Sequence, residues 1–97
     1  MKIGYFADGP WSHKALELIK DISNAKLTFI VARYPNPDKI LQDWAKKLNI
    51  PFFVHQDINS KEFLKCIRGL SDINVSLSFN QIFKEDIINS TPMKLIN

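Results

Sequence analysis

The stretch SLSFNQIF at residues 76–83 carries side chains well suited to binding a small molecule. Hydroxyl and amide groups from Ser78, Asn80 and Gln81 come directly after a run that predicts a buried strand, and an apolar pair follows. Such a loop presents backbone N–H and C=O groups to a flat heterocycle while apolar side chains enclose its faces. On composition alone, an ordinary turn between a strand and a helix is an equally good interpretation.

The first loop, ADGPWS at residues 7–12, does not have the pattern of a dinucleotide site. It contains one glycine, Gly9, where the fingerprint G-x-G-x-x-G needs three, for the turn, the approach of the pyrophosphate and the helix packing. The chain also lacks the lysine of a Walker A loop. A nicotinamide, flavin or P-loop nucleotide site is therefore not expected.

The residues that most often bind metals or act as acids and bases are isolated in the sequence. His13 and His55 have no second histidine or carboxylate at ligand spacing, so we interpret both as surface or packing residues and expect no metal. Cys66, the single cysteine, cannot form an internal disulfide, and its position predicts a small side chain in the core. Asp8 follows the first strand, where catalytic carboxylates often lie, but we interpret it as a helix cap.

Apolar runs that alternate with amphipathic stretches predict the elements that position these loops. Strands are expected at residues 3–7, 26–32, 52–54, 73–78 and 93–96, and helices at 11–23, 40–48, 84–90 and from Asn59 or Ser60 to Ile67. This order predicts an α/β fold, a Rossmann-like open parallel sheet with helices on both faces. Ligands bind such sheets at the carboxyl ends of the strands, so the loops at 8–12, 32–37 and 78–83 are the relevant ones.

Composition predicts one soluble globular domain over residues 1–97. Of the residues, 45% are hydrophobic, and the formal charge of +3 comes from 13 Lys and Arg against 10 Asp and Glu along the whole chain. Scattered charges of this kind predict solvated helix faces and no nucleic-acid partner. The first apolar run is broken by Gly4 and Asp8, so we expect a strand there, neither a signal peptide nor a membrane span, and a cytoplasmic protein.

The stretch SLSFNQIFKEDIINSTPMKLIN at residues 76–97 resembles a segment of the folate-dependent formyltransferase family. That family has a strand, a polar loop with an Ile-Leu or Ile-Phe pair, a short helix, and a strand that ends in Ile-Asn. The resemblance extends over nearly the whole chain, including the turn at Gly9 and Pro10. In the family one residue and a histidine follow Ile-Asn, and an aspartate comes later; neither has a counterpart here. The resemblance implies the N-terminal part of a formyltransferase catalytic domain, truncated at its C-terminus.

The resemblance also implies a reaction, the transfer of a formyl group from N10-formyltetrahydrofolate to a primary amine. Asn97 matches the catalytic asparagine, and its side-chain NH₂ would donate to the oxyanion of the tetrahedral intermediate. The missing histidine and aspartate imply that residues 1–97 alone are inactive. The cofactor-binding candidates are Ser78, Phe79, Asn80, Gln81, Ile82 and Phe83. The substrate-binding candidates are Gly9, Pro10 and Trp11.

Two departures from family patterns indicate the substrate. The segment ARYPNPDK at 32–39 is short and has only Arg33 and Lys39 where members acting on tRNA have a longer basic insertion, and ADGPWS lacks the Gly-Ser-Asn loop of members acting on glycinamide ribonucleotide. The remaining resemblance is to sugar N-formyltransferases, which formylate the amine of a nucleotide-linked amino sugar. It also makes a homodimer a possible state of the full-length protein. Methionyl-tRNA formyltransferase is an alternative within the family. A non-catalytic flavodoxin-like or receiver-like binding module is the alternative outside it.

Overall fold

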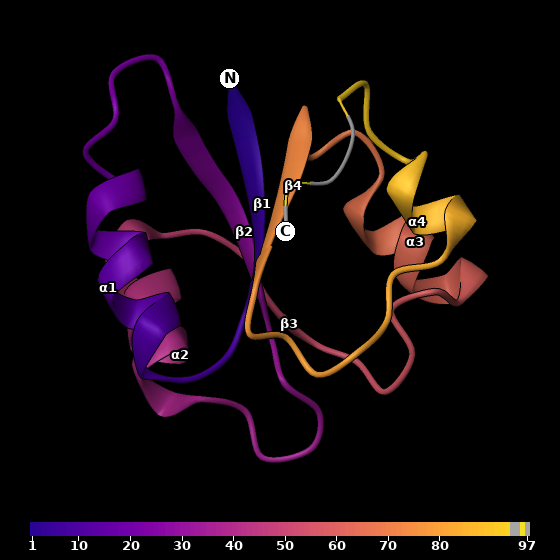
Figure 1. Ribbon diagram of the computed structural model, residues 1–97, viewed down its shortest axis with the longest axis horizontal. Coiled ribbons are helices and arrows are strands. Elements are labelled where there is room, and N and C mark those ends of the chain that lie inside the picture. Colours follow the sequence, from indigo (N-terminus) through magenta and orange to yellow (C-terminus); the bar gives the residue numbers. More distant parts are fainter. Residues whose placement is uncertain (94–95, 97) are drawn as a thin grey trace.

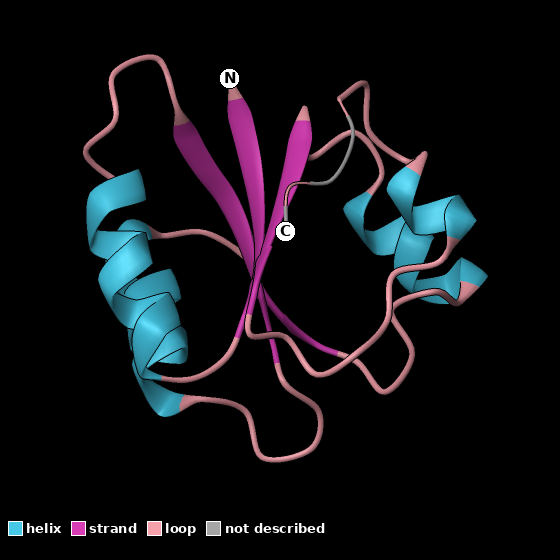
Figure 2. Cartoon of the chain, in the orientation of Figure 1, coloured by secondary structure: helices cyan, strands magenta, loops and turns pink. Residues whose placement is uncertain are grey.

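The computed structural model describes residues 1–93 and 96 and contains one all-parallel sheet between two layers of helices (Figures 1 and 2). The strands are β1 (Lys2–Ala7), β2 (Lys26–Ala32), β3 (Phe52–Val54) and β4 (Ile73–Leu77). The helices are α1 (Pro10–Ile19), α2 (Lys39–Leu48), α3 (Lys61–Ile67) and α4 (Glu85–Ile88). The predicted α/β fold with an open parallel sheet is confirmed.

The strands lie in the order β3-β2-β1-β4, which is that of the first four strands of the Rossmann fold. Flavodoxin-like and receiver domains have the order 2-1-3-4-5 instead, so the topology does not fit that alternative. The chain steps outward from β1 to β3 and then returns to the far side of β1. The strand order therefore reverses between β1 and β4, and the loop at residues 78–83, called the β4 loop below, begins at that point.

The predicted strand at residues 93–96 lies partly outside the described residues. Within them, Ile96 forms an isolated parallel bridge with Val75 on β4. The amide of Ile96 donates to the carbonyl oxygen of Asn74 at 3.0 Å, and the amide of Ser76 donates to that of Ile96 at 2.8 Å. The main chain at Ile96 thus runs beside β4 and in the same direction.

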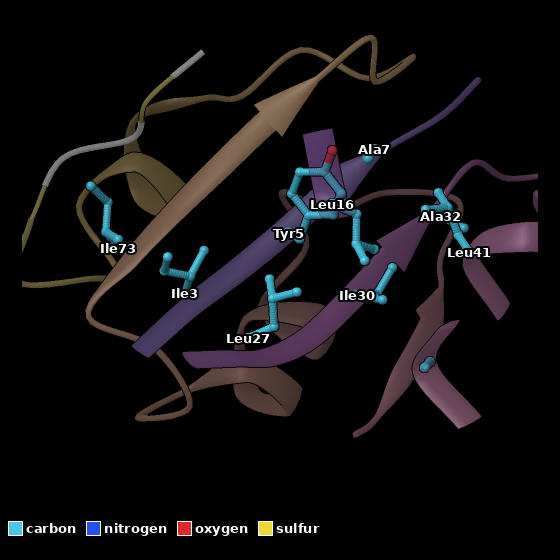
Figure 3. Packing of buried hydrophobic residues seen from close by; sticks show 10 residues of the cluster. Ile3, Tyr5, Ala7, Leu16, Leu27, Ile30, Ala32, Leu41 and Ile73 are labelled. Atoms are coloured by element: carbon cyan, nitrogen blue, oxygen red, sulfur yellow. The ribbon is translucent and has the colours of Figure 1, made fainter. Parts of the chain in front are cut away.

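Two separate hydrophobic cores flank the sheet. The first lies under α1 and α2 (Figure 3) and contains Ile3, Tyr5, Ala7, Leu16, Leu27, Ile30, Ala32, Leu41, Ala45 and Ile73. The second lies under α3 and α4 and contains Phe6, Phe29, Val31, Ile58, Phe63, Ile67 and Ile87. Because β1 and β2 are buried on both faces, their sequences show no sustained alternation of polar and apolar residues.

The second core depends on a glycine in β1. A Cβ atom at Gly4 would lie 2.3 Å from Cζ of Phe29 and 2.5 Å from Oδ1 of Asn74, closer than atoms can pack. The Asn74 side chain is itself held by a 2.8 Å hydrogen bond from the hydroxyl of Ser71. Glycine at position 4 therefore lets β1 pass beside a buried ring and a buried amide.

Two local predictions are wrong. Gly9, with φ of 83°, is the N-cap of α1, and no side chain caps that helix, so Asp8 does not have the capping role. Asp8 lies one residue before the N-cap, and its Oδ2 lies 3.7 Å from Nη1 of Arg33 instead. Cys66 is exposed because the buried stripe of α3 is formed by Phe63 and Ile67, and Cys66 lies to one side of that stripe, about 60° around the helix from Phe63 and about 100° from Ile67.

Other helix ends follow their sequence signals. Ser60 caps α3, since its Oγ accepts a hydrogen bond from the amide of Phe63 at 3.1 Å. The second helix ends at Asn49, which has the left-handed conformation typical of such positions. In the described part of the chain, α1 and α2 have 10 residues each, and no helix has the length and apolar character needed to cross a membrane.

Candidate functional site

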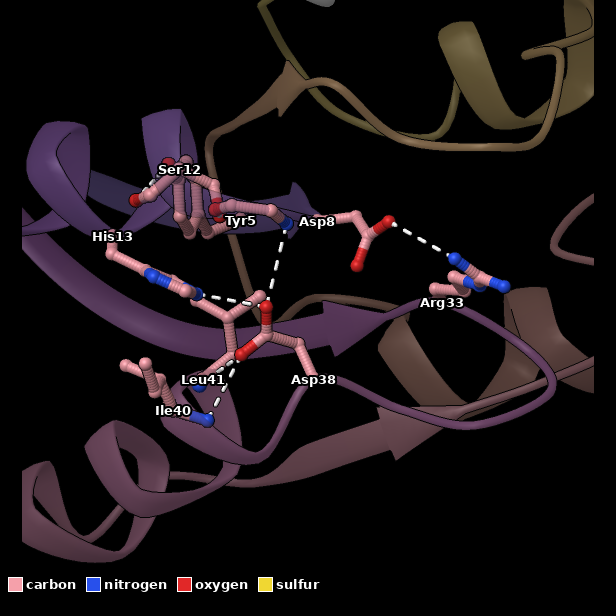
Figure 4. Close-up of polar contacts among 9 residues, drawn as sticks. Tyr5, Asp8, Ser12, His13, Arg33, Asp38, Ile40 and Leu41 are labelled. Carbon is pink, nitrogen blue, oxygen red and sulfur yellow. Dashed lines mark hydrogen bonds and ion pairs between the residues drawn. The ribbon is translucent and has the colours of Figure 1, made fainter.

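The loops that follow β1 and β2 meet at the carboxylate of Asp38 (Figure 4). Oδ1 of Asp38 accepts hydrogen bonds from the amides of Ile40 at 2.9 Å and Leu41 at 3.1 Å, which makes Asp38 the N-cap of α2. Oδ2 lies 2.8 Å from Nε2 of His13 on α1 and accepts a longer hydrogen bond, 3.4 Å, from the amide of Gly9. One side chain therefore joins the N-terminal ends of α1 and α2.

The surroundings of Asp38 favour its ionised form. Burial alone would raise the pKa of Asp38, but the hydrogen bond to His13, the amide of Leu41, the charge interaction with His13 and the amide of Gly9 together lower it below its ordinary value. The Asp38 side chain is only 12% exposed, so these contacts are largely shielded from water. The carboxylate is therefore negative at neutral pH.

This carboxylate changes what the start of α1 can bind. In the Rossmann fold, a pyrophosphate binds the free amides at the N-terminus of the first helix. Here the amide of Gly9 points to Asp38, and Pro10 has no N–H to offer. A phosphate placed at the start of α1 would meet a negative charge and few donors.

A buried hydrogen-bond chain fixes the turn between β1 and α1. The Tyr5 hydroxyl donates to the carbonyl oxygen of Ser12 at 2.8 Å, and the Ser12 hydroxyl donates to the carbonyl oxygen of Gly9 at 2.6 Å (Figure 4). Burial raises the pKa of Tyr5 to about 12, so the phenol is neutral and donates at all ordinary pH values. The turn is thus held in place by Tyr5, a core residue of β1.

Asp8 and Arg33 form a partly exposed ion pair at the ligand edge of the sheet. Oδ2 of Asp8 lies 3.7 Å from Nη1 of Arg33, which is too long for a hydrogen bond (Figure 4). The amide of Asp8 donates to the carbonyl oxygen of Leu77 at 3.3 Å, which places Asp8 beside the end of β4. A carboxylate and a guanidinium therefore lie close to the point where the strand order reverses.

Two amide side chains hold the β4 loop to its neighbours. Oε1 of Gln81 accepts a hydrogen bond from the amide of Ile58 at 2.9 Å, and Nε2 of Gln81 donates to the carbonyl oxygen of His55 at 2.8 Å. Nδ2 of Asn80 donates to the carbonyl oxygen of Tyr34 at 3.2 Å. Both amides are thus engaged within the protein, and direct contact with a cofactor stays a prediction.

Asn59 closes the far end of the β4 loop. Its Nδ2 donates to the carbonyl oxygen of Ile82 at 2.8 Å, and its Oδ1 accepts from the amide of Lys84 at 2.8 Å. Within the loop, none of the backbone amides of residues 79–83 donates a hydrogen bond to any atom of the described residues. The loop is therefore held by its side chains and its ends, and its backbone donors stay available.

The apolar residues of the β4 loop point in two directions. Phe79 and Phe83 pack edge-on against Phe6 of the second core, with ring centroids 5.7 Å and 5.0 Å away. Ile82 is exposed. Ser78 is also exposed and has a left-handed backbone with φ of 57°, which starts the turn out of β4. The loop therefore combines an anchored aromatic base with one apolar side chain facing solvent.

The remaining predicted site residues are spread along the first loop and beyond. Gly9 belongs to the Asp38 cluster, whereas Pro10 and Trp11 are exposed, and Nζ of Lys14 lies 5.9 Å from the Trp11 ring centroid. Asn97 lies outside the described residues. His55 is partly buried with its ring 5.4 Å from that of Phe63, in agreement with a packing role.

A hollow of about 490 Å³ adjoins the β4 loop at the carboxyl ends of β2 and β3. Its lining residues are Tyr34, Val54, His55, Gln56, Asp57, Ser60 and Glu62. Tyr34 and His55 are also the residues whose carbonyl oxygens bind Asn80 and Gln81. In residues 1–93 and 96, no three His, Cys, Asp or Glu side chains gather closely enough to hold a metal.

Sequence reasoning did not identify the central residue of the polar cluster. An aspartate directly before an amphipathic helix is a recognisable capping signal, and Asp38 has that position. Its contact with His13 spans 25 residues and depends on α1 and α2 packing side by side on one face of the sheet. No family model matches the chain, and no curated protein sequence matches it either.

Proposed function

We propose that the chain is the N-terminal, Rossmann-like part of a cytoplasmic folate-dependent formyltransferase. The proposed co-substrate is N10-formyltetrahydrofolate, and the proposed acceptor is the amine of a nucleotide-linked amino sugar. The observation that carries the proposal is the run of unpaired amides at residues 79–83, beside the reversal of strand order. Together with the resemblance of residues 76–97, it makes the β4 loop the best candidate for the pterin.

The chemistry of a pterin suits this loop. The ring system has N–H donors as well as nitrogen and oxygen acceptors along its edge, and it has two apolar faces, so it needs backbone N–H and C=O groups and an apolar neighbour. The amides of 79–83 supply donors, and Ile82 supplies an exposed apolar side chain. The Gln81 and Asn59 anchors hold the donors in place before the ligand arrives, which lowers the entropy lost on binding.

The acceptor would approach from the β1 side of the same edge, past Gly9 and Pro10. The charge at the start of α1 disfavours a phosphate there, so Arg33 is the better partner for the diphosphate of a nucleotide sugar. Asp8 can accept a hydrogen bond from an amine or a sugar hydroxyl. These groups lie on the β1 and β2 loops, beside the β4 loop.

In the proposed reaction the acceptor nitrogen attacks the formyl carbon, and the bond from that carbon to N10 of the folate breaks. The amine loses a proton, and N10 gains one. Asn97 would donate to the oxyanion, and the histidine and aspartate of the family would move the proton. Because residues 1–97 contain no counterpart of that pair, we expect the isolated chain to bind folate without transferring the formyl group.

Binding can be mapped residue by residue. Tetrahydrofolate is added to ¹⁵N-labelled chain 1–97, and the amide resonances are followed by NMR. We expect the largest shifts at residues 79–83 and none on the outer side of α2. The double variant Asn80→Ala/Phe83→Ala should bind at least about tenfold more weakly, because it removes one tie and the aromatic base of the loop.

The matched control is Gln42→Ala on α2, which should leave folate affinity unchanged. Circular dichroism confirms that each variant is folded. Absence of binding, shifts centred away from the β4 loop, or equal affinity in the double variant would each overturn the placement. Turnover of N10-formyltetrahydrofolate with an amino-sugar nucleotide by the pure chain would contradict the need for the missing pair.

A further inference from the structure

The outer side of α1 carries an apolar stripe that no described residue covers. Trp11 is 72% exposed, Leu18 is 73% exposed and Ile22 is 53% exposed. Spacings of seven and four residues place these side chains on one side of a helix. Ile22 lies just after α1, where its amide still bonds the carbonyl oxygen of Ile19 at 3.1 Å and continues the turn. Single exposed apolar residues are ordinary, but a contiguous stripe marks an interface.

The stripe is on the side of α1 that faces away from α2. The core side of the helix is marked by the buried residues Ser12 and Leu16, and the α2 side by His13, which bonds Asp38. At 100° per residue, Trp11 and Leu18 lie far around the helix from His13. A partner can therefore lie along α1 without displacing α2 or its cap.

We propose that this stripe binds the same stripe of a second copy of the chain, with the two α1 helices antiparallel about a twofold axis. Such an axis opposite the middle of α1 pairs Trp11 with Ile22 of the second copy. It also pairs Leu18 with Ala15 of the second copy, so that a large side chain meets a small one. The contact is isologous and closes at the dimer.

The charges beside the stripe match this arrangement. Lys14, Glu17 and Asp21 are exposed on the same flank of the helix. In the antiparallel pair, Lys14 of each copy lies between Glu17 and Asp21 of the other. The charges that face each other across this contact are opposite in sign, so they favour the antiparallel arrangement.

A hollow beside Trp11 gives the contact a specific shape. It has a volume of about 110 Å³, is lined by Pro10, Trp11 and Lys14, and can hold one aliphatic side chain. In the antiparallel pair Ile22 of the second copy reaches this hollow. The inference does not rest on the proposed reaction.

Sedimentation velocity measurements on chain 1–97 test the dimer. Because the stripe is small, we expect a weak association, with the mean mass rising from the 11.2 kDa monomer toward its double between about 10 μM and about 1 mM. Leu18→Glu should weaken the association at least about tenfold, since it places two charges in the apolar contact. The control Ile40→Glu makes the same change at an exposed position of α2 and should have no effect.

A charge exchange tests the register. Lys14→Glu should weaken the dimer, and the triple variant Lys14→Glu/Glu17→Lys/Asp21→Lys should restore it. All variants change exposed residues, and thermal unfolding confirms that they fold. A monomer at every concentration, an association that Leu18→Glu leaves unchanged, or a triple variant no better than Lys14→Glu would overturn the proposal.

Discussion

Nε2 of His13 and Oδ2 of Asp38 lie 2.8 Å apart and connect two helices whose N-terminal ends both face the ligand edge of the sheet. The same carboxylate caps α2 and accepts from the amide of Gly9. The position of the first loop relative to the second therefore depends on one ionised side chain. This dependence can be measured as a change in stability with pH.

The substitution Asp38→Asn should make the protein less stable at neutral pH and remove part of its acid sensitivity. Asparagine still caps α2 through Oδ1, but its Nδ2 cannot accept the hydrogen bond from the amide of Gly9 or replace the charged partner of His13. We therefore expect a loss of about 1–2 kcal/mol at pH 7. The pKa of Asp38 is lowered in the folded protein, so its contribution is present above the unfolded value of about 3.9 and is lost as the pH falls through the folded pKa.

Urea unfolding at pH 7 and near pH 2 measures this difference. The gap between wild type and Asp38→Asn should narrow at the lower pH. The control Asp43→Asn removes an exposed carboxylate of α2 and should have little effect at either pH. A gap of constant size would show that the charge of Asp38 does not stabilise the fold.

The substitution Tyr5→Phe should make the protein less stable at neutral pH but less sensitive to alkaline pH than wild type. Below pH 10 the variant is less stable by about 1 kcal/mol, because the buried carbonyl of Ser12 loses its donor. The folded pKa of Tyr5 is about 12 against an ordinary 10.0, so wild type loses stability as the pH rises from the unfolded value through the folded one. Tyr5→Phe lacks this loss.

Unfolding curves between pH 9 and about pH 12 compare the two proteins, with the exposed Tyr34→Phe as the control. The variant Tyr5→Phe should become relatively more stable as the pH rises, whereas Tyr34→Phe should follow wild type. Parallel curves for all three proteins would argue that the Tyr5 phenol titrates normally.

The substitution Gly4→Ala should destabilise the protein by about 3 kcal/mol or more, because the new methyl group would overlap the Phe29 ring and the Asn74 amide, both buried. Gly69→Ala is the matched control. A Cβ at Gly69 meets nothing, but its φ of 74° strains alanine, so we expect a cost of about 1 kcal/mol. Equal losses for the two variants, measured by urea unfolding, would contradict the close packing at Gly4.

The substitution Gln81→Ala should free the β4 loop and cost about 2 kcal/mol, since the amide of buried Ile58 loses its acceptor. Gln81→Glu keeps that acceptor but loses the donor to His55, so its effect should be intermediate. The exposed control Gln56→Ala should be neutral. Unfolding free energies measure all three variants, and a neutral Gln81→Ala would mean that other contacts hold the loop.

The sequence was sufficient to predict the layers of this fold because its strands are buried on both faces and its helices have apolar stripes of the right period. Residues 26–32 illustrate this, since a nearly unbroken apolar and β-branched run is typical of a central strand that is covered on both faces. The cap at Ser60 was also predictable, because it is a local interaction over three residues.

The details of the site depend on contacts that no local pattern encodes. Gln81 reads as an exposed loop residue, yet its amide bonds two groups 23 and 26 residues away. Asp8 has the sequence position of a cap, but Gly9 is the N-cap, and the Asp8 carboxylate lies 3.7 Å from Nη1 of Arg33 on the next loop. In both cases the deciding term is the packing of segments distant in sequence.

The two cores under opposite faces of the sheet predict two separate patterns of amide hydrogen exchange. The β4 loop is bonded to the α3 side through Gln81 and Asn59, whereas the Asp38 cluster belongs to the α1 and α2 side. Local opening of one helical layer leaves the other packed. A small molecule that touches both loops would couple the two openings, so its binding should slow exchange in helices that it never contacts.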